Sequence, residues 1–170
     1  MLVIRAESPQ DRPLIDTLNR EAFAGPVEAD LIERLRAEGL VVSSLVAAAD
    51  AGIVGHILFS DLDVSVDGRQ VAAVSLAPMA VRRGEQRRGI GSQLVRAGLD
   101  DVRRKGPTAV LVLGHPAYYP RFGFRRSLPE NWRPLMRGPR SWRWNSCLGR
   151  RAVKAAPSTI LMPSKRDACA

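Results

Sequence analysis

The sequence predicts an α/β (α+β) fold, in which helices flank a mixed central sheet, and three observations predict it. Apolar residues recur at helical spacing in three segments, and β-rich runs lie between these segments. Turn pairs such as Asp67-Gly68 join consecutive β-rich runs. The chain has 170 residues, of which 45% are hydrophobic, and this is enough for one domain with a buried core.

The N-terminal part predicts one strand and two helices. Residues 2–6 form a short apolar run that is typical of a strand. Ser8 can cap a helix over residues 9–23, and Gly25-Pro26 interrupts the helical pattern. A second helix is expected over residues 27–38, because Gly39 favours a helix end.

The middle part predicts three strands, a long helix and a further strand. Strands are expected over residues 40–49, 53–66 and 71–81, with turns between them. A helix is expected over residues 89–105, and a short buried strand over residues 108–113. Residues 115–122 are expected to form one or two helical turns.

Charge is distributed unevenly along the chain. The formal net charge is +9, but residues 1–124 contain 15 basic and 15 acidic residues, whereas residues 125–170 contain 11 and 2. A basic tail alone is weak support for nucleic-acid binding. No apolar run reaches the ~20 residues of a membrane helix, and two cysteines predict no zinc site or disulfide framework. We therefore expect a cytoplasmic protein without a metal.

A basic, glycine-bearing loop separates the strand that ends near residue 81 from the helix that begins near residue 89. Gly89 and Gly91 let backbone N–H groups approach a ligand without an intervening Cβ atom. Arg87 and Arg88 add positive charge where the helix dipole also favours an anion. The loop therefore predicts a site for a phosphate or pyrophosphate group.

Two common phosphate-binding motifs do not fit this loop. Gly84 and Gly89 have the spacing of a nucleotide-triphosphate loop, but Ile90 stands where that loop needs its lysine. A dinucleotide fingerprint needs a third glycine or alanine where this chain has Leu94. Both nucleotide classes are therefore disfavoured.

Two motifs resemble those of the GNAT superfamily of N-acetyltransferases. Gln86-x-x-Gly89-x-Gly91 matches the acetyl-CoA signature of that family, Arg/Gln-x-x-Gly-x-Gly/Ala. Tyr119-Pro-Arg-Phe-Gly123-Phe124 resembles the family's Tyr-x-x-x-Gly-Phe element after its fifth strand. The resemblance covers residues 1–124 and includes a bacterial subgroup of small N-acetyltransferases, whereas residues 125–170 depart from the family.

The resemblance implies where acetyl-CoA would bind as cosubstrate. In the family, strands four and five splay apart around the pantetheine arm, so Met79 and Val81 would offer main-chain groups to it. A main-chain N–H near Ala80 would donate to the developing oxyanion. Main-chain N–H groups would hold the pyrophosphate, from Gln86, Arg87, Arg88, Gly89, Ile90, Gly91 and Ser92.

The resemblance also implies direct transfer of the acetyl group to a primary amine. Tyr119 is the expected acid for the leaving thiolate, because a phenol of pKa about 10 stays protonated at neutral pH. Tyr118 is the alternative acid, and Tyr119 can instead be a packing aromatic. His56 is a candidate general base, with a hydrogen-bonded strand histidine as the other interpretation, and His115 is a weaker candidate.

The acceptor stays open at this stage, between a small-molecule amine and a peptide amine. Asp61, Asp63 and Glu85 are candidate contacts for it. A homodimer is left open, and neither a membrane nor a nucleic acid is expected as a partner. Two alternative functions are a catalytically weak acyl-CoA-binding module and a basic nucleic-acid binder.

Residues 125–170 form an atypical basic tail behind the predicted acetyl-CoA-binding core of residues 1–124. Back-translation of Ser141-Trp-Arg-Trp-Asn-Ser146, read two bases later, permits Met-Ala-Leu-Glu-Leu, a segment typical of the family's last strands. The hypothesis is that a frameshift near residues 125–135 replaced the native C-terminus, and the alternative is a divergent or disordered tail. We expect missing or altered C-terminal strands and an open edge on the fifth strand.

Overall fold

The computed structural model describes residues 1–50, 52–66, 69–107, 109–113 and 117–124, and the backbone of residues 132–133 and 159–163. Its contacts divide the chain into two compact units. Unit one contains Met1–Ser60 and Leu76–Lys105, and unit two contains Asp61–Ser75 and Gly106–Ala170. The boundary expected after residue 124 stays a prediction.

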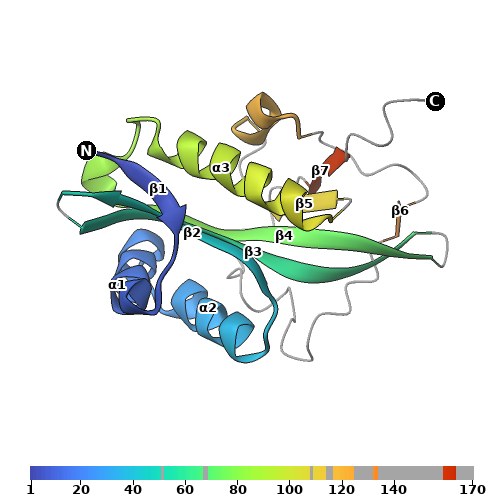
Figure 1. Cartoon of the computed structure of the whole chain (residues 1–170), viewed down its shortest axis with the longest axis horizontal. Coiled ribbons are helices and arrows are strands. Elements are labelled where there is room, and N and C mark those ends of the chain that lie inside the picture. Colours follow the sequence, from blue (N-terminus) through green and yellow to red (C-terminus); the bar gives the residue numbers. More distant parts are fainter. Residues whose placement is uncertain are drawn as a thin grey trace. The chain divides into compact units, whose positions relative to one another are not determined.

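Unit one is a sheet with helices on both faces. Its strands, in the order β1-β2-β3-β4, are β1 (Val3–Ala6), β2 (Val41–Ala49), the first part of β3 (Gly52–Val66) and the last part of β4 (Arg69–Val81). Its helices are η1 (Pro9–Asp11), α1 (Arg12–Phe23), α2 (Val27–Ala37), η2 (Arg83–Glu85) and α3 (Ile90–Lys105). Figure 1 shows α1 and α2 on one face of the sheet and α3 on the other.

Unit two continues the sheet in the order β3-β4-β5-β7, with β6 paired to β3. Its further elements are β5 (Ala109–Leu113), η3 (Tyr119–Phe122), β6 (Trp132–Arg133) and β7 (Thr159–Pro163). A small apolar cluster forms its core, from Leu62, Val64, Ala73, Ala109 and Leu111, with Val71 packed against it. The predicted fold class is confirmed, whereas the predicted splaying of β4 and β5 stays a prediction.

The first helix begins differently from the expectation. Ser8 does not cap one continuous helix, because η1 precedes α1. The Ser8 backbone N–H and hydroxyl both donate to Asp11 Oδ2, at 2.7 and 2.8 Å. Arg5 donates to both oxygens of the same carboxylate, at 2.6 and 2.9 Å. These bonds hold the pKa of Asp11 well below its usual range and fasten the end of β1 to the start of α1.

Our expectation of an open edge on the fifth strand is wrong. β7 pairs with β5 in antiparallel register, from Ala109 opposite Pro163 to Leu113 opposite Thr159. The run Ile160-Leu161-Met162 is short and lacks alternation, but β5 offers it a complete row of backbone partners. The frameshift hypothesis rests on residues 125–146, which, apart from residues 132–133, lie outside the described residues.

Two glycines let α3 pack closely against β3 within unit one. A Cβ atom on Gly55 would lie 2.9 Å from Leu94 Cδ1 and 3.2 Å from Ile90 Cγ2. A Cβ atom on Gly98 would lie 2.8 Å from Cζ of Phe59. Since Ile90 is the first residue of α3, Gly55 also fixes where the N-terminus of this helix lies.

We expect Gly98→Ala to destabilise the protein. Helix propensity alone would stabilise the variant by up to about 1 kcal/mol. The added methyl group would meet the ring of Phe59, which is fully buried, and such overpacking costs about 1–3 kcal/mol. Thermal unfolding should therefore show a Tm several degrees lower. Gly25→Ala is the control, because nothing lies within 4 Å of its Cβ position, and an unchanged or higher Tm for Gly98→Ala would contradict the packing argument.

Candidate active site

The loop of residues 82–89 follows β4, and we refer to it as the anion-binding loop. Hydrogen bonds hold it in place where it leaves the sheet. The Arg82 backbone N–H donates to the carbonyl of Val54 at 2.9 Å, and its Nη2 donates to the carbonyl of Ile53 at 2.9 Å. Gln86 reaches back through Nε2 to the carbonyl of Val81 at 3.1 Å. The loop therefore leaves the sheet in a fixed direction.

The conformation of the loop suits an anion. Arg87 and Gly89 have φ angles of 63° and 81°, in the left-handed region that glycine tolerates best. Gln93 N–H donates to the carbonyl of Gly89 at 3.0 Å, so Gly89 begins the helical bonding of α3. The first N–H groups of a helix have no acceptor within the helix, and backbone of alternating hand forms an anion-binding concavity. The loop therefore fits a pyrophosphate group.

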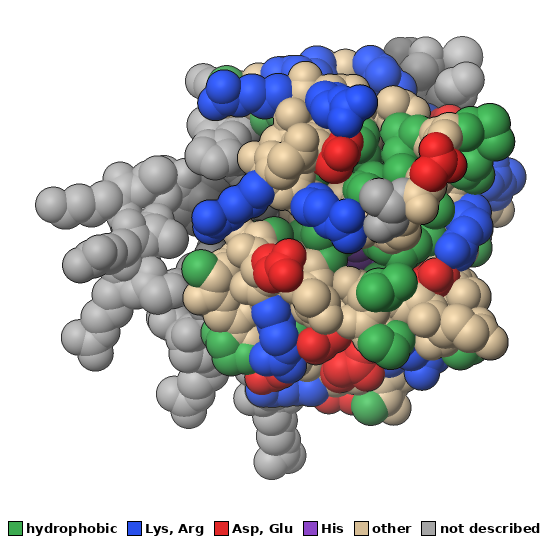
Figure 2. Space-filling view, turned by 90° about the vertical axis from the view of Figure 1, so that its left-hand side faces the viewer, with side chains coloured by type: hydrophobic (Ala, Val, Ile, Leu, Met, Phe, Trp, Pro, Cys, Tyr) green, Lys and Arg blue, Asp and Glu red, His purple; other side chains and the backbone are tan. Residues whose placement is uncertain are grey.

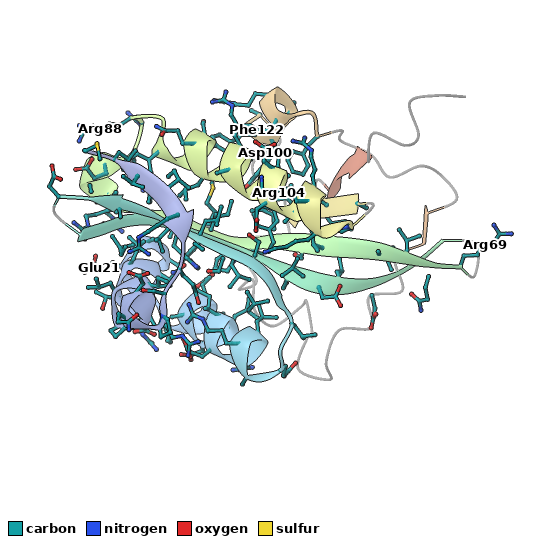
Figure 3. All side chains as sticks on the ribbon, viewed as in Figure 1. Glu21, Arg69, Arg88, Asp100, Arg104 and Phe122 are labelled. Atoms are coloured by element: carbon teal, nitrogen blue, oxygen red, sulfur yellow. The ribbon has the colours of Figure 1, made fainter. Side chains whose placement is uncertain are left out.

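Basic side chains surround this concavity. Arg87 and Arg88 are exposed, and Figure 2 shows Lys and Arg side chains along this end of the molecule. Arg88, labelled in Figure 3, forms an ion pair with Glu85. Glu85, which we expected as a contact for an amine, is therefore engaged within the loop.

Gly89→Ala tests the loop conformation directly. A non-glycine residue in the left-handed region costs roughly 1–2 kcal/mol, so the variant should either strain the loop or move it. We expect acetyl-CoA to bind about tenfold more weakly by calorimetry. Gly84→Ala is the matched control, because Gly84 lies in the same loop without a positive φ and without atoms near its Cβ position. Equal affinities for the two variants would contradict the assignment.

The last residues of β4 alternate in exposure. Ala80 is buried, whereas Met79 and Val81 on either side are partly exposed. Their main-chain groups lie directly before the anion-binding loop in unit one. Their roles toward the thioester arm stay predictions.

His56 lies in the core of unit one. Its side chain is 0% exposed, its Nε2 lies 2.9 Å from Ser44 Oγ, and its Nδ1 lies 3.4 Å from Asn19 Nδ2. Ser44 donates its own proton to Glu7, so its oxygen accepts from Nε2–H of His56. Asn19 can only donate through Nδ2, so Nδ1 accepts. The network thus assigns a neutral imidazole protonated at Nε2.

Glu7 and Arg36 complete this network. Arg36 Nη2 and Nε donate to the two oxygens of Glu7 at 2.6 and 3.1 Å. Burial raises the pKa of Glu7, but the nearby His56, 3.8 Å away, and the hydrogen bonds from Arg36 and Ser44 outweigh it and lower the pKa to about 2. Burial lowers the pKa of His56, against the raising effect of Glu7. The network ties Glu7, which directly follows β1, together with β2 and β3 to α1 and α2.

Tyr119 lies in an aromatic cluster of unit two. Its ring meets Tyr118 edge-on at 5.1 Å and Phe124 at 5.6 Å between centroids. Burial raises the pKa of Tyr119 to about 12, and Tyr118 adds to the shift. The Tyr118 ring instead stacks under the guanidinium of Arg121 at 4.7 Å. Of the two tyrosines, Tyr119 is the more buried.

Within unit one the structure groups the predicted loop residues, and within unit two it separately groups the aromatic residues. Asp61 and Asp63 are exposed on the part of β3 in unit two, and His115 lies outside the described residues. Sequence reasoning missed the anchoring role of Arg82 and the close packing at Gly55. A glycine inside a strand pattern is the signal that indicates such close approach. No signal in the sequence indicated the role of Arg82.

Comparisons with known proteins agree with this fold. Residues 4–127 match the family model described as an acetyltransferase (GNAT) domain. The uncharacterized N-acetyltransferase YhbS of Escherichia coli is 42% identical over 124 residues, which are 72% of this chain and 73% of that protein. The uncharacterized N-acetyltransferase YjhQ of the same species is 37% identical over 112 residues, 65% of this chain and 62% of that protein.

Solved structures of GNAT proteins resemble the model. YhbS from Escherichia coli, in complex with CoA, has a TM-score of 0.68 at 41% identity, over 74% of this chain and 69% of that one. A GNAT acetyltransferase from Brucella melitensis, in complex with acetyl-CoA, has a TM-score of 0.68 at 34% identity, over 82% of this chain and 90% of that one.

A mixed sheet flanked by helices, with an anion-binding loop before α3, defines the class of acyltransferases that use a coenzyme A thioester. The chain belongs to the GNAT acetyltransferase family. Among the helices that the structure describes, none is long and apolar enough to cross a membrane.

Proposed function

We propose that the protein transfers an acetyl group from acetyl-CoA directly to a primary amine. The left-handed Arg87 and Gly89 just before α3 are the observation that carries this proposal, because they turn the loop into a concavity for a pyrophosphate. The GNAT relatives in complex with CoA and acetyl-CoA support it. A location in the cytoplasm and a homodimer stay predictions.

Each part of the proposed site has a defined task. Main-chain N–H groups of residues 86–92 and the guanidinium groups of Arg87 and Arg88 hold the pyrophosphate. Met79 and Val81 offer main-chain groups to the pantetheine arm. When bound, acetyl-CoA supplies the thioester whose carbonyl carbon an amine attacks. The N–H of Ala80 is the proposed donor to the oxygen that becomes negative.

The bonds and protons of a direct acetyl transfer balance without an acyl-enzyme intermediate. A C–N bond forms and the C–S bond breaks, the amine loses one proton to solvent, and the thiolate gains one. Tyr119 is the proposed donor of that proton. Its pKa of about 12 keeps the phenol protonated at neutral pH. The same value makes a free tyrosinate costly beside a thiolate of pKa about 8.5, so the phenol passes its proton to the sulfur only as a proton from water replaces it.

We assign His56 to the framework of unit one rather than to proton transfer. Its ring is inaccessible and both of its nitrogens are engaged. A general base needs contact with the amine or with one bridging water. The amine is therefore proposed to lose its proton to water.

Calorimetry with acetyl-CoA and a thiol-release assay on a panel of amines test the proposed function. Binding together with release of CoA thiol, dependent on an amine, is the expected result. Binding without turnover would instead favour the acyl-CoA-binding module. No binding of acetyl-CoA would refute both.

A further inference from the structure

A hollow lies between α1 and the root of the anion-binding loop, and both of its walls belong to unit one. Its volume is about 330 Å³, and it is lined by Leu18, Glu21, Ala22, Arg82, Arg83 and Gly84. We call it the α1 hollow. Ligand pockets have volumes of roughly 300–1,000 Å³, so this hollow suits a ligand of the size of an amino acid or a dipeptide.

The α1 hollow presents opposite charges on its two walls. Glu21 leaves α1 at the end of the molecule that carries the loop (Figure 3). Its neighbour Arg20 forms ion pairs with Asp16 and Asp30. Within the described part of the chain, Glu21 makes no hydrogen bond or ion pair, although Arg82 and Arg83 line the same hollow.

The two arginines differ in how firmly they are held. Arg82 is fixed by its bonds to the carbonyls of Ile53 and Val54, which leave further N–H donors of its guanidinium group for a ligand. Arg83 is exposed, and its side chain has no ion pair among the described residues.

This combination selects a ligand chemistry. Guanidinium groups bind a carboxylate with matched, paired hydrogen bonds, and a carboxylate such as Glu21 accepts from an amine N–H. Leu18 and Ala22 offer apolar contact to an aliphatic body between the two ends. The two guanidinium groups outnumber the single carboxylate, so a polyamine without an acidic group is repelled.

We propose that the α1 hollow binds the acceptor, and that the acceptor is a small molecule with both a free amine and a carboxylate. The inference rests on the proposed function, and it names the substrate class. Arg82 directly follows Val81 and lies two residues from Ala80, or roughly 7 Å along a strand. A dipeptide-sized ligand held at Arg82 and Arg83 can span that distance. Glu21, Arg82 and Arg83 thus determine specificity and position the acceptor.

Ligand-observed NMR tests the inference, with the twenty L-amino acids and glycyl dipeptides as probes. Each probe is compared with its C-terminal amide, and each measurement is made both with and without CoA. At least one acid should bind, and its amide should bind at least tenfold more weakly. Arg83→Gln should weaken binding of the acid about tenfold and leave the amide unchanged. Glu21→Gln should weaken both. Arg34→Gln and Glu38→Gln, which alter exposed charges outside the hollow, should change neither.

Calorimetry with acetyl-CoA on every variant separates the two proposals. Unchanged acetyl-CoA affinity in Glu21→Gln and Arg83→Gln, with weaker acid binding, supports the acceptor assignment. An equal loss of acetyl-CoA and acid affinity would assign the hollow to the cosubstrate and overturn the inference. The inference would also be overturned if the protein bound acetyl-CoA but no probe, or if it bound the acid and its amide with equal affinity. A protein that binds no acetyl-CoA refutes the proposed function, while the NMR comparison still decides what the hollow binds.

Discussion

Tyr119→Phe is expected to lower kcat about a hundredfold, because positioned acids contribute roughly 10²- to 10⁴-fold to a rate. The variant removes only the hydroxyl group, so the ring contacts with Tyr118 and Phe124 can persist. The affinity for acetyl-CoA should therefore stay within about twofold. Steady-state kinetics and calorimetry on the same preparation measure the two quantities.

Tyr118→Phe is the matched control for this experiment. It removes a hydroxyl group from the adjacent ring, which stacks under Arg121, and kcat should change little. A role of Tyr119 in packing alone would lower Tm and acetyl-CoA affinity together, without a selective loss of kcat. A larger loss of kcat in Tyr118→Phe than in Tyr119→Phe would transfer the acid role to Tyr118.

The pH dependence of kcat offers a second readout of Tyr119. The phenol acts in its protonated form, and its pKa is raised to about 12. Its contribution is therefore complete at neutral pH and is lost only as the pH approaches 12. We expect kcat to rise as the amine loses its proton and then to stay level up to about pH 10. A fall of kcat between pH 8 and 10 that is absent in Tyr119→Phe would contradict the raised pKa.

Glu7→Gln is expected to reduce the free energy of unfolding by about 3 kcal/mol, because removing one partner of a buried ion pair costs about 3–5 kcal/mol. The Arg36 side chain is 8% exposed and that of Glu7 is 15% exposed, so solvent cannot replace the lost carboxylate. Chemical denaturation measures the change. Glu33→Gln is the control, since Glu33 also pairs with Arg36 but is 54% exposed, and its loss should cost less than 1 kcal/mol.

Acid should destabilise the native protein through the same network. His56 has a lowered pKa in the folded state, so the unfolded chain binds the proton first and stability is lost as the pH falls below about 6.5. The pKa of Glu7 is about 2 in the folded protein, compared with an ordinary value of 4.5. Its contribution to stability is therefore complete above pH 4.5 and is lost as the pH falls toward 2. Both effects lower the free energy of unfolding in acid.

Denaturation curves between pH 7 and pH 3 separate the two groups. Glu7→Gln should retain a decline that begins near pH 6.5 and show a smaller further decline below pH 4.5, which Asp11, whose pKa is also lowered, still contributes. Parallel curves for the variant and the native protein below pH 4.5 would show that Glu7 does not carry the expected stabilisation.

Local patterns in the sequence predicted much of the fold. The helix over residues 89–105 and the strand over residues 53–66 differ from α3 and β3 by one residue at the N-terminal end. Their signals are periodicity and glycine positions, which act within one turn or one hairpin. The anion-binding loop was predicted for the same reason, since Gly89 marks the left-handed position that the loop requires.

Contacts between distant segments could not be predicted in this way. His56 was a candidate base because its ordinary pKa lies near neutrality, but its burial depends on α1 and α2 covering that face of β3. The pairing of β7 with β5 was missed because Ile160-Leu161-Met162 is too short a signal without its partner strand. The α1 hollow escaped notice because Glu21 and Arg83 lie 62 residues apart.

By itself, the sequence determined the order of the main helices and strands up to residue 124, the glycine positions of the loop proposed to bind phosphate, and the resemblance to GNAT acetyltransferases, because each depends on residues that are close neighbours along the chain. Only the tertiary structure decided that His56 is held in a buried network and that Glu21 shares a hollow with Arg82 and Arg83. The physical reason is that burial and charge pairing depend on which segments meet in space, and no local pattern specifies that.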